Sequence, residues 1–202
     1  MNRGCRANKT GFVLEATVEG TLRGHGYLEI CPELPKKRKL DWLLLSTANP
    51  KRYAKQVYIG SSIYETEINV DFYIVGSGSF PLGLIVECKW QEDKGSVDEK
   101  YPYLNLNIKT CYGVPTIVIV GGDGMRQGSI DWFKKQIPDN QNLLGVHKLE
   151  GFITWANKPF FEETAIIYDN AAFKYFYFTK LKRIALFFRV NRLTLTVLGS
   201  II

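Results

Sequence analysis

The 202-residue chain lacks the features that mark several large classes of protein. No uncharged apolar run reaches the roughly 18 residues that a membrane-spanning helix needs, so a channel or a carrier is excluded. Its four cysteines form no Cys-x-x-Cys pair, and neither histidine lies within zinc-finger spacing of one, so structural zinc is not expected. No apolar signal-peptide core lies near residue 1. The sequence therefore indicates an intracellular protein, cytoplasmic or nucleoid-associated, with no membrane span.

Charge is distributed unevenly along the chain, although the net value is only +6. Residues 1–60 carry 11 Lys and Arg against 5 Asp and Glu, residues 61–169 carry 9 against 15, and residues 170–202 carry 6 against none. An acidic middle between basic flanks suits a cation-binding site beside a polyanion such as nucleic acid. The counts alone do not distinguish this interpretation from chance.

Hydrophobic periodicity predicts a mixed α/β sheet with helices on its faces, in a single domain over residues 1–169. The predicted elements are, in chain order, 10–20 (helix), 57–59, 68–75 and 82–90 (strands), 96–108 (helix), 115–120 (strand), 129–137 (helix) and 149–155 (candidate last strand). Residues 170–202 form a basic, aromatic tail of uncertain structure. The tail is compatible with strands that complete the sheet, a membrane-surface element, a dimer contact, or sequence outside the functional domain.

Two charged clusters precede the first predicted strand. Glu15 and Glu19 stand four residues apart on the first predicted helix, so they share a face, which by itself suits a solvated acidic stripe. Phe12, Val13, Ala16 and Leu22 are compatible with helical spacing. The four consecutive cations of residues 36–39 follow a proline-rich turn and predict a solvated loop, a phosphate contact or a targeting signal.

Charged residues interrupt the apolar strand predicted over 82–90. Side chains two residues apart in a strand point to one face, so Glu87, Lys89 and Gln91 share a face, while Val86 and Cys88 lie on the other with Trp90. Burial of a charge is costly unless the charge is paired or bound to a metal. A charged stripe on a core strand therefore indicates a function.

The strands over 68–75 and 82–90 flank a glycine-rich turn and predict an antiparallel hairpin. Pairing of Val75 near Leu84 places Asp71 opposite residues 87–89. Two carboxylates at that distance repel each other unless a cation lies between them, and oxygen ligands without Cys or His suit Mg²⁺ or Mn²⁺. The alternative is a cross-strand ion pair between Glu87 and Lys89 at a sheet edge.

These residues resemble the signature of the PD-(D/E)XK nuclease superfamily, which is an acid on one hairpin strand followed by (D/E)-x-K on the next. Asp71 and Glu87-Cys88-Lys89 match it, and the resemblance covers about residues 10–155. Val70 stands where the signature has proline, a position that supplies no ligand. The resemblance implies a restriction-endonuclease-like fold and a Mg²⁺-dependent DNA endonuclease.

The resemblance also implies the roles of individual residues. Asp71, Glu87 and the backbone carbonyl of Cys88 would bind Mg²⁺, for which Mn²⁺ would substitute, and Glu15 would be a further acid near the metal, with Glu19 as its substitute. Catalysis would depend on the two acids together with Lys89, which would orient or help deprotonate the attacking water and offset developing charge, and with Gln91, which would position water or backbone.

Double-stranded DNA is the expected partner, and basic residues near the predicted site are candidates to contact its phosphates. They are Lys36, Lys37, Arg38, Lys39, Lys51, Arg52 and Lys55. A homodimer is expected only by analogy with enzymes that cut both strands. The alternatives are a DNA repair or recombination nuclease, a non-catalytic DNA-binding module that keeps the fold, and a sheet protein whose charged hairpin is structural.

Overall fold

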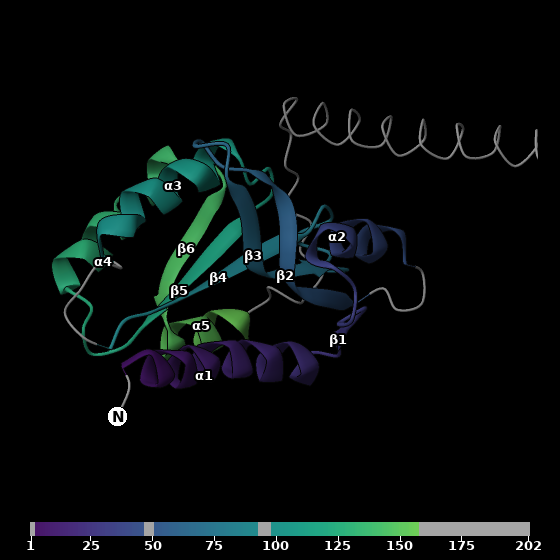
Figure 1. Ribbon diagram of the computed structural model, residues 1–202, viewed down its shortest axis with the longest axis horizontal. Coiled ribbons are helices and arrows are strands. Elements are labelled where there is room, and N and C mark those ends of the chain that lie inside the picture. Colours follow the sequence, from purple (N-terminus) through teal and green to yellow (C-terminus); the bar gives the residue numbers. More distant parts are fainter. Residues whose placement is uncertain (1–2, 47–50, 93–97, 158–202) are drawn as a thin grey trace, which may run out of the picture. The chain divides into compact units, whose positions relative to one another are not determined.

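A mixed sheet carries the two strands of the predicted hairpin near its centre (Figure 1). The computed structural model describes residues 3–46, 51–92 and 98–157. Its helices and strands are α1 (Arg3–Gly24), β1 (Leu28–Glu29), α2 (Lys36–Leu45), β2 (Arg52–Ser61), β3 (Glu67–Val75), β4 (Leu84–Trp90), α3 (Tyr101–Thr110), β5 (Thr116–Gly121), α4 (Gln127–Lys134), β6 (Leu143–Lys148) and α5 (Leu149–Ala156), with short 3₁₀ turns at Asp98–Lys100 and Ile137–Asp139.

The six described strands follow one another in sequence order across the sheet. Strand β1 pairs parallel with β2, the strands β2, β3 and β4 pair antiparallel, and β4, β5 and β6 pair parallel. The predicted mixed α/β sheet is therefore confirmed. Strand β4 is the border between the antiparallel and the parallel half, so it has one neighbour of each kind.

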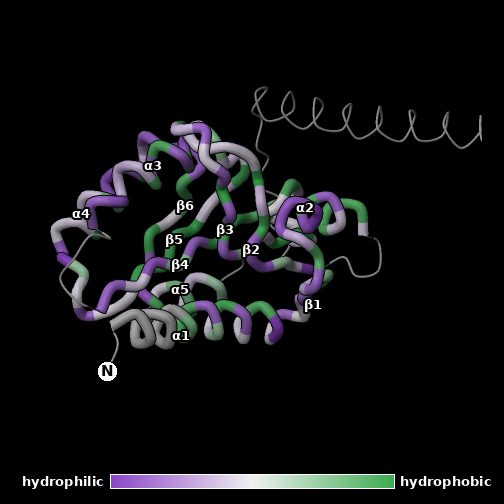
Figure 2. The backbone as a smooth tube through the Cα atoms, viewed as in Figure 1, coloured by the Kyte–Doolittle hydropathy of each residue, from purple (hydrophilic) through white to green (hydrophobic). Residues whose placement is uncertain are grey.

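Helices cover both faces of the sheet. Helices α1 and α5 lie side by side against one face, and α3 and α4 lie on the other (Figure 1). Hydrophobic residues line β5 (Figure 2), which is buried along almost its whole length, as a parallel strand covered on both faces must be. The core on the α1 side joins buried side chains of α1, of α5 and of the strands β2 to β5, among them Leu14, Val18, Phe72, Val86 and Phe152.

The predicted hairpin is present, and its register lies in the predicted range. Ile74 pairs with Leu84 and Phe72 pairs with Val86. The turn begins at Gly76, whose φ of 93° is a backbone conformation that residues other than glycine rarely adopt. Phe72 and Val86 are fully buried on the same face, so this half of the hairpin is part of the core.

The first helix is longer than predicted, and its buried face is different. Helix α1 begins at Arg3, and the residues that it buries stand four apart at Leu14, Val18 and Leu22. Of the four apolar residues with predicted helical spacing, Leu22 is buried, whereas Phe12, Val13 and Ala16 are exposed. The four-residue spacing defines a stripe along one side of the helix, and that stripe decides which face packs on the sheet.

Two further predictions from periodicity, for residues 149–155 and for the start of the helix over 96–108, were wrong. Residues 149–155, a candidate strand, form α5, in which the buried Phe152 and Ala156 stand one helical turn apart. The last described strand is instead β6. The helix predicted over 96–108 begins at Tyr101, because Pro102 is tolerated only in the first turn; residues 96–97 lie outside the described residues.

The tail predicted over residues 170–202 lies outside the described residues, as does the end of the predicted domain from residue 158 onward. Among the described helices, none combines the length and the apolar character that crossing a bilayer demands.

Candidate active site

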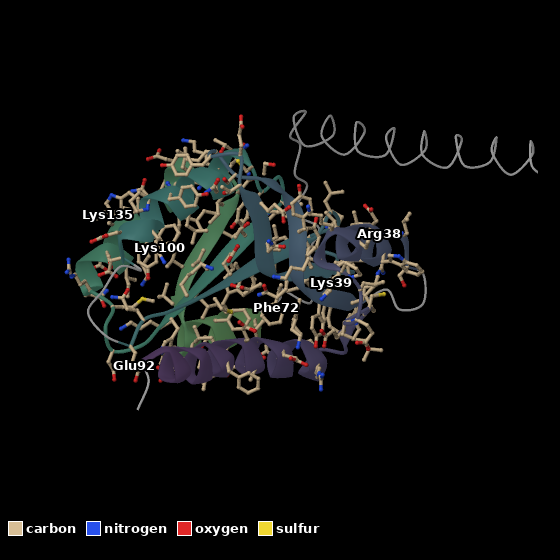
Figure 3. The ribbon with its side chains drawn as sticks, viewed as in Figure 1. Arg38, Lys39, Phe72, Glu92, Lys100 and Lys135 are labelled. Carbon is tan, nitrogen blue, oxygen red and sulfur yellow. The ribbon has the colours of Figure 1, made fainter. Side chains whose placement is uncertain are left out.

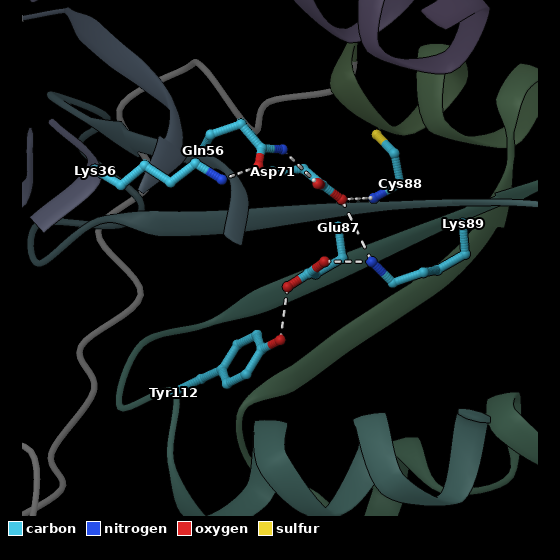
Figure 4. Close-up of polar contacts among 7 residues, drawn as sticks. All are labelled: Lys36, Gln56, Asp71, Glu87, Cys88, Lys89 and Tyr112. Atoms are coloured by element: carbon cyan, nitrogen blue, oxygen red, sulfur yellow. Dashed lines mark hydrogen bonds and ion pairs between the residues drawn. The ribbon is translucent and has the colours of Figure 1, made fainter. Parts of the chain in front are cut away.

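Strands β3 and β4 separate at Asp71, immediately beyond the pair Phe72 and Val86. Asp71 accepts a hydrogen bond from the backbone N–H of Cys88 through its Oδ2 atom, at 2.8 Å (Figure 4). A side-chain carboxylate thus takes the place of a backbone bond between the two strands. We call the opening between residues 67–71 of β3 and 87–90 of β4 the fork.

The two predicted acids meet around the predicted lysine in the fork. The Nζ atom of Lys89 lies 2.6 Å from Glu87 Oε2 and 3.4 Å from Asp71 Oδ2 (Figure 4). The two oxygens therefore cannot be farther apart than these two distances together. Val86, Cys88 and Trp90 pack on the core of the opposite face, so the predicted alternation along β4 is confirmed.

Burial and charge act against each other in this cluster. Burial raises the pKa of Glu87, although the neighbouring Lys89 lowers it in part. Burial alone would lower the pKa of Lys89, but the carboxylates of Glu87 and Asp71 raise it above its ordinary value. Lys89 therefore stays an ammonium that contacts both acids of the fork.

Two residues that sequence reasoning did not identify complete the contacts of the acids. Gln56 of β2 donates through Nε2 to Asp71 Oδ1 at 3.0 Å, and Tyr112 donates through its hydroxyl to Glu87 Oε1 at 2.6 Å (Figure 4). Burial, followed by the charge of Glu87, raises the pKa of the Tyr112 hydroxyl, which therefore keeps its proton. The pairing of β2 with β3 could have indicated Gln56, whereas no sequence signal indicates Tyr112.

A cavity of about 410 Å³ opens from the fork toward α3. Glu87 and Lys89 line one wall, and Tyr101 and Tyr112 line another. The Oδ1 atom of Asn69 is buried in its lining and has no hydrogen-bond partner among the described residues. A buried oxygen without a partner is costly, so it indicates a place for a donor that a ligand or its water would supply.

This geometry agrees with what a comparison with protein families finds. Residues 6–160 match the PD-(D/E)XK nuclease superfamily domain. The chain belongs to this superfamily. The match spans all the described strands and confirms the predicted resemblance to the superfamily. Comparisons with curated proteins and with solved structures find no match. Superfamily members are typically metal-dependent phosphodiesterases, and the nuclease domain indicates a nucleic-acid substrate.

The residues of the fork fit the divalent metal that this superfamily typically uses. Backbone N–H groups of Ile85 and Gln91 donate toward the β5 side of β4, so the alternation of the strand turns the N–H and C=O of Cys88 toward Asp71. Two carboxylates and this carbonyl make a hard oxygen donor set. Mg²⁺ keeps several waters, and the partnerless oxygen of Asn69 would accept a hydrogen bond from one.

Glu15 lies near the fork but outside its set of acids. In the described part of the chain, no three His, Cys, Asp or Glu side chains gather as a metal-binding group. Burial, and then the charge of Asp71, raises the pKa of Glu15, so its carboxylate is within electrostatic reach of the site. Glu19 instead pairs with Arg23 and with Lys55, at 2.9 Å from the latter, and these cations lower its pKa.

Gln91 directly follows β4, and its contacts include the loop after β5. Its side-chain amide donates to the backbone carbonyl of Gly124 at 3.0 Å, and its backbone carbonyl accepts from the N–H of Gly124. The backbone of Gly122 runs so close to Gln91 that an added Cβ would lie 2.0 Å from the Gln91 carbonyl oxygen. These contacts connect Gln91 to the loop after β5, so the structure does not bring it into the fork.

Six of the seven basic candidates have partners within the protein, and those of Lys36 and Lys37 are the side chains of Gln56 and Glu67. The ammonium of Lys39 is buried and donates to the Lys55 carbonyl, and burial lowers its pKa. Arg52 donates to the Leu43 carbonyl at 2.7 Å, in the last turn of α2, where carbonyl groups lack helical partners. Lys55 pairs with Glu19, and Lys51 donates to a backbone carbonyl.

Three of these candidates lie on the surface of α2. Residues 36–39, predicted as a loop, form the first turn of this helix, directly after Pro35. Lys36, Lys37 and Arg38 are exposed, and Figure 3 marks Arg38 beside the buried Lys39. Lys36 donates to Gln56 Oε1 at 3.2 Å, so this turn is two side chains away from Asp71.

Proposed function

We propose that the chain is a Mg²⁺-dependent DNA endonuclease that hydrolyses phosphodiester bonds. The observation that carries the proposal is the position of the Lys89 ammonium between Asp71 and Glu87, in the fork where two strands separate. Buried charges cost a fold stability, so they are kept where they serve a function. A chain that had lost catalysis would be expected to lose at least one of Asp71, Glu87 and Lys89. This argues against a non-catalytic binding module and against a purely structural hairpin.

Asp71, Glu87 and the backbone carbonyl of Cys88 are the proposed metal ligands, with Glu15 as a further acid acting at longer range. Bound Mg²⁺ supplies Lewis-acid polarisation of the phosphate and a water that is nucleophilic at neutral pH. Each carboxylate oxygen has two lone pairs, so the contacts that Asp71 and Glu87 make with their neighbours leave capacity for a metal.

Lys89 is the proposed catalytic cation. Its raised pKa keeps Nζ protonated, so it donates hydrogen bonds and cannot take a proton in this state. It would orient the attacking water and offset the negative charge that develops on the phosphate. Tyr112 fixes Glu87 from the opposite side, which leaves the Glu87 carboxylate little rotational freedom.

We propose that DNA reaches the fork along the first turn of α2. Lys36, Lys37 and Arg38 are exposed there, at the positive end of the helix dipole. Contacts of this kind position the backbone of DNA without reading its sequence. Binding should therefore weaken steeply as the salt concentration rises.

Incubation of the purified chain with supercoiled plasmid tests the activity, with Mg²⁺, with EDTA and with excess Mg²⁺ added back. The expected result is cleavage in Mg²⁺ that EDTA abolishes and Mg²⁺ restores. Discrete fragments would support a restriction-like enzyme, and preference for nicked or branched substrates would support a repair or recombination nuclease. Binding of DNA with no cleavage in Mg²⁺ or Mn²⁺ would overturn the proposal in favour of a binding module.

We further propose a restriction-endonuclease-like arrangement over residues 1–169, with residues 170–202 as a separate basic tail. A truncation after residue 169 tests the boundary. The shortened chain should keep the thermal unfolding midpoint of the full chain, and a large loss of stability would place the tail within the domain. Sedimentation with and without DNA would show whether a homodimer forms.

A further inference from the structure

Gln56 has an unusual backbone conformation at the position opposite Asp71. Lys55 pairs with Phe72 and Val57 pairs with Val70, so Gln56 faces Asp71 across the two strands. Its φ is +52°, in the left-handed region that residues other than glycine rarely adopt and that is foreign to a strand. Such strain persists only where the surroundings impose it, and it is concentrated at functional sites.

The amide of Gln56 has a defined direction. Its Nε2 atom donates to Asp71 Oδ1 at 3.0 Å, and its Oε1 atom accepts from Lys36 Nζ at 3.2 Å (Figure 4). A flipped amide would place its oxygen against the Asp71 carboxylate and its NH₂ against the Lys36 ammonium, and both contacts would be repulsive. Lys36 therefore fixes the orientation in which Gln56 donates to Asp71.

Asp71 is consequently held at both carboxylate oxygens. Oδ1 accepts from Gln56, and Oδ2 accepts from the Cys88 N–H at 2.8 Å. A carboxylate held at one oxygen can rotate about its terminal bond, whereas one held at both has a fixed plane. A fixed plane determines where the remaining lone pairs point, which is what a metal ligand requires.

We propose that Gln56, oriented by Lys36, is a positioning residue that fixes the Asp71 carboxylate for the metal in the fork. The inference rests on the proposed function, because it assigns Asp71 to the metal site. In this arrangement the uncharged side chain of Gln56 connects Asp71 of the metal site to Lys36 in the exposed basic turn of α2.

The test is the affinity of the full chain for Mn²⁺ without DNA, measured by calorimetry, together with the thermal unfolding midpoint. Gln56→Gly removes the amide but accepts the positive φ, so the variant should fold. We expect its Mn²⁺ affinity to fall about 10- to 100-fold. Glu65→Gly is the matched control, since Glu65 has a φ of +61° in the turn before β3; its Mn²⁺ affinity should equal that of the wild type.

Lys36→Met gives a second test that does not alter the strained position. Removal of a cation near a metal site should strengthen Mn²⁺ binding if only charge matters. If Lys36 orients Gln56, the same variant should bind Mn²⁺ more weakly than the wild type, and this result would support the proposal even if Gln56→Gly fails to fold.

The outcomes separate the two proposals. Wild-type Mn²⁺ affinity in Gln56→Gly, or tighter binding in Lys36→Met, would overturn the role of Gln56 and leave the proposed function intact. A wild-type chain that binds no Mn²⁺ would overturn both. A change in the unfolding midpoint of Gln56→Gly with no change in Mn²⁺ affinity would reduce Gln56 to a structural residue.

Discussion

The two halves of the hairpin formed by β3 and β4 use the same strands for opposite purposes. In the closed half, residues 72–74 pair with residues 84–86, and buried side chains such as Phe72 and Val86 pack on the core. In the open half, the strands part at Asp71, and charged side chains replace apolar ones. The closed half stabilises the fold, and the open half gives up stability for chemistry, as enzyme sites commonly do.

The largest effect is expected from Asp71→Asn, which changes the open half without changing its shape. The amide oxygen can still accept from the Cys88 N–H, but the new NH₂ group would face the NH₂ group of Gln56, so a modest loss of stability is expected. Loss of a metal ligand should lower the cleavage rate by about a thousandfold or more. Initial rates on plasmid, alongside urea unfolding, measure both quantities.

Asp139→Asn is the matched control, since Asp139 is exposed in the 3₁₀ turn after α4 and should be neutral in both assays. Cleavage by Asp71→Asn at near the wild-type rate would remove Asp71 from the chemistry.

Phe72→Ala should have the opposite consequence, because it alters the closed half. Removal of this fully buried ring should lower the free energy of unfolding by about 3–5 kcal/mol. The fraction that remains folded at low temperature should still cleave DNA. Urea unfolding followed by circular dichroism measures the loss, and Phe12→Ala, at an exposed position of α1, should cost far less. Equal losses in the two variants would contradict the division between the halves.

Glu87→Gln should lower activity and flatten the pH dependence of stability. Burial raises the pKa of the Glu87 carboxyl in the folded chain above its value in the unfolded chain. The folded state therefore gains stability from the protonated carboxyl at low pH, and this stability is lost as the pH rises through the folded pKa. Glutamine removes that loss and can still accept from Lys89. Unfolding free energies at several pH values from 4.5 to 7 should fall less steeply in the variant. Parallel pH profiles would contradict the burial cost assigned to Glu87, and Glu99→Gln, at an exposed position, should match the wild type.

The smallest effect is expected at His147 of β6, away from the fork. Burial, and then the charge of Lys134, lowers its pKa in the folded chain. Just below pH 6.5 the unfolded chain therefore binds a proton at His147 more readily than the folded chain does. Stability is therefore lost as pH falls below 6.5, toward the lowered folded value. His147→Asn should reduce the slope of unfolding free energy between pH 7 and 5.5 and leave cleavage unchanged. An unchanged slope would show that other groups cause the acid sensitivity.

Hairpin arithmetic and the alternation of strands predicted the open half well. The spacing of the turn placed Asp71 across from residues 87–89, and the side-chain period of two put Glu87 and Lys89 on one face. These rules depend only on the regular geometry of adjacent paired strands, so the positions of side chains follow from their sequence numbers. They failed where irregular backbone decides, as at Gln56, whose positive φ leaves no mark in the sequence.

Long-range partners were equally invisible in the sequence. Tyr112 reaches Glu87 only because α3 folds back over the sheet, and the partners of Arg52 and Lys55 depend on where α1 and α2 pack. The aromatic and β-branched composition of residues 149–155 favoured a strand, but the core on the α1 side required a helix there. Local propensity is a weak guide where tertiary packing decides.

The most direct measurement of the metal site is a crystal structure of the Mn²⁺-soaked protein with an anomalous difference map. The account predicts a single strong peak in the fork, within coordination distance of an Asp71 oxygen, a Glu87 oxygen and the Cys88 carbonyl oxygen. A map with no peak there, or with Mn²⁺ bound only elsewhere, would contradict it.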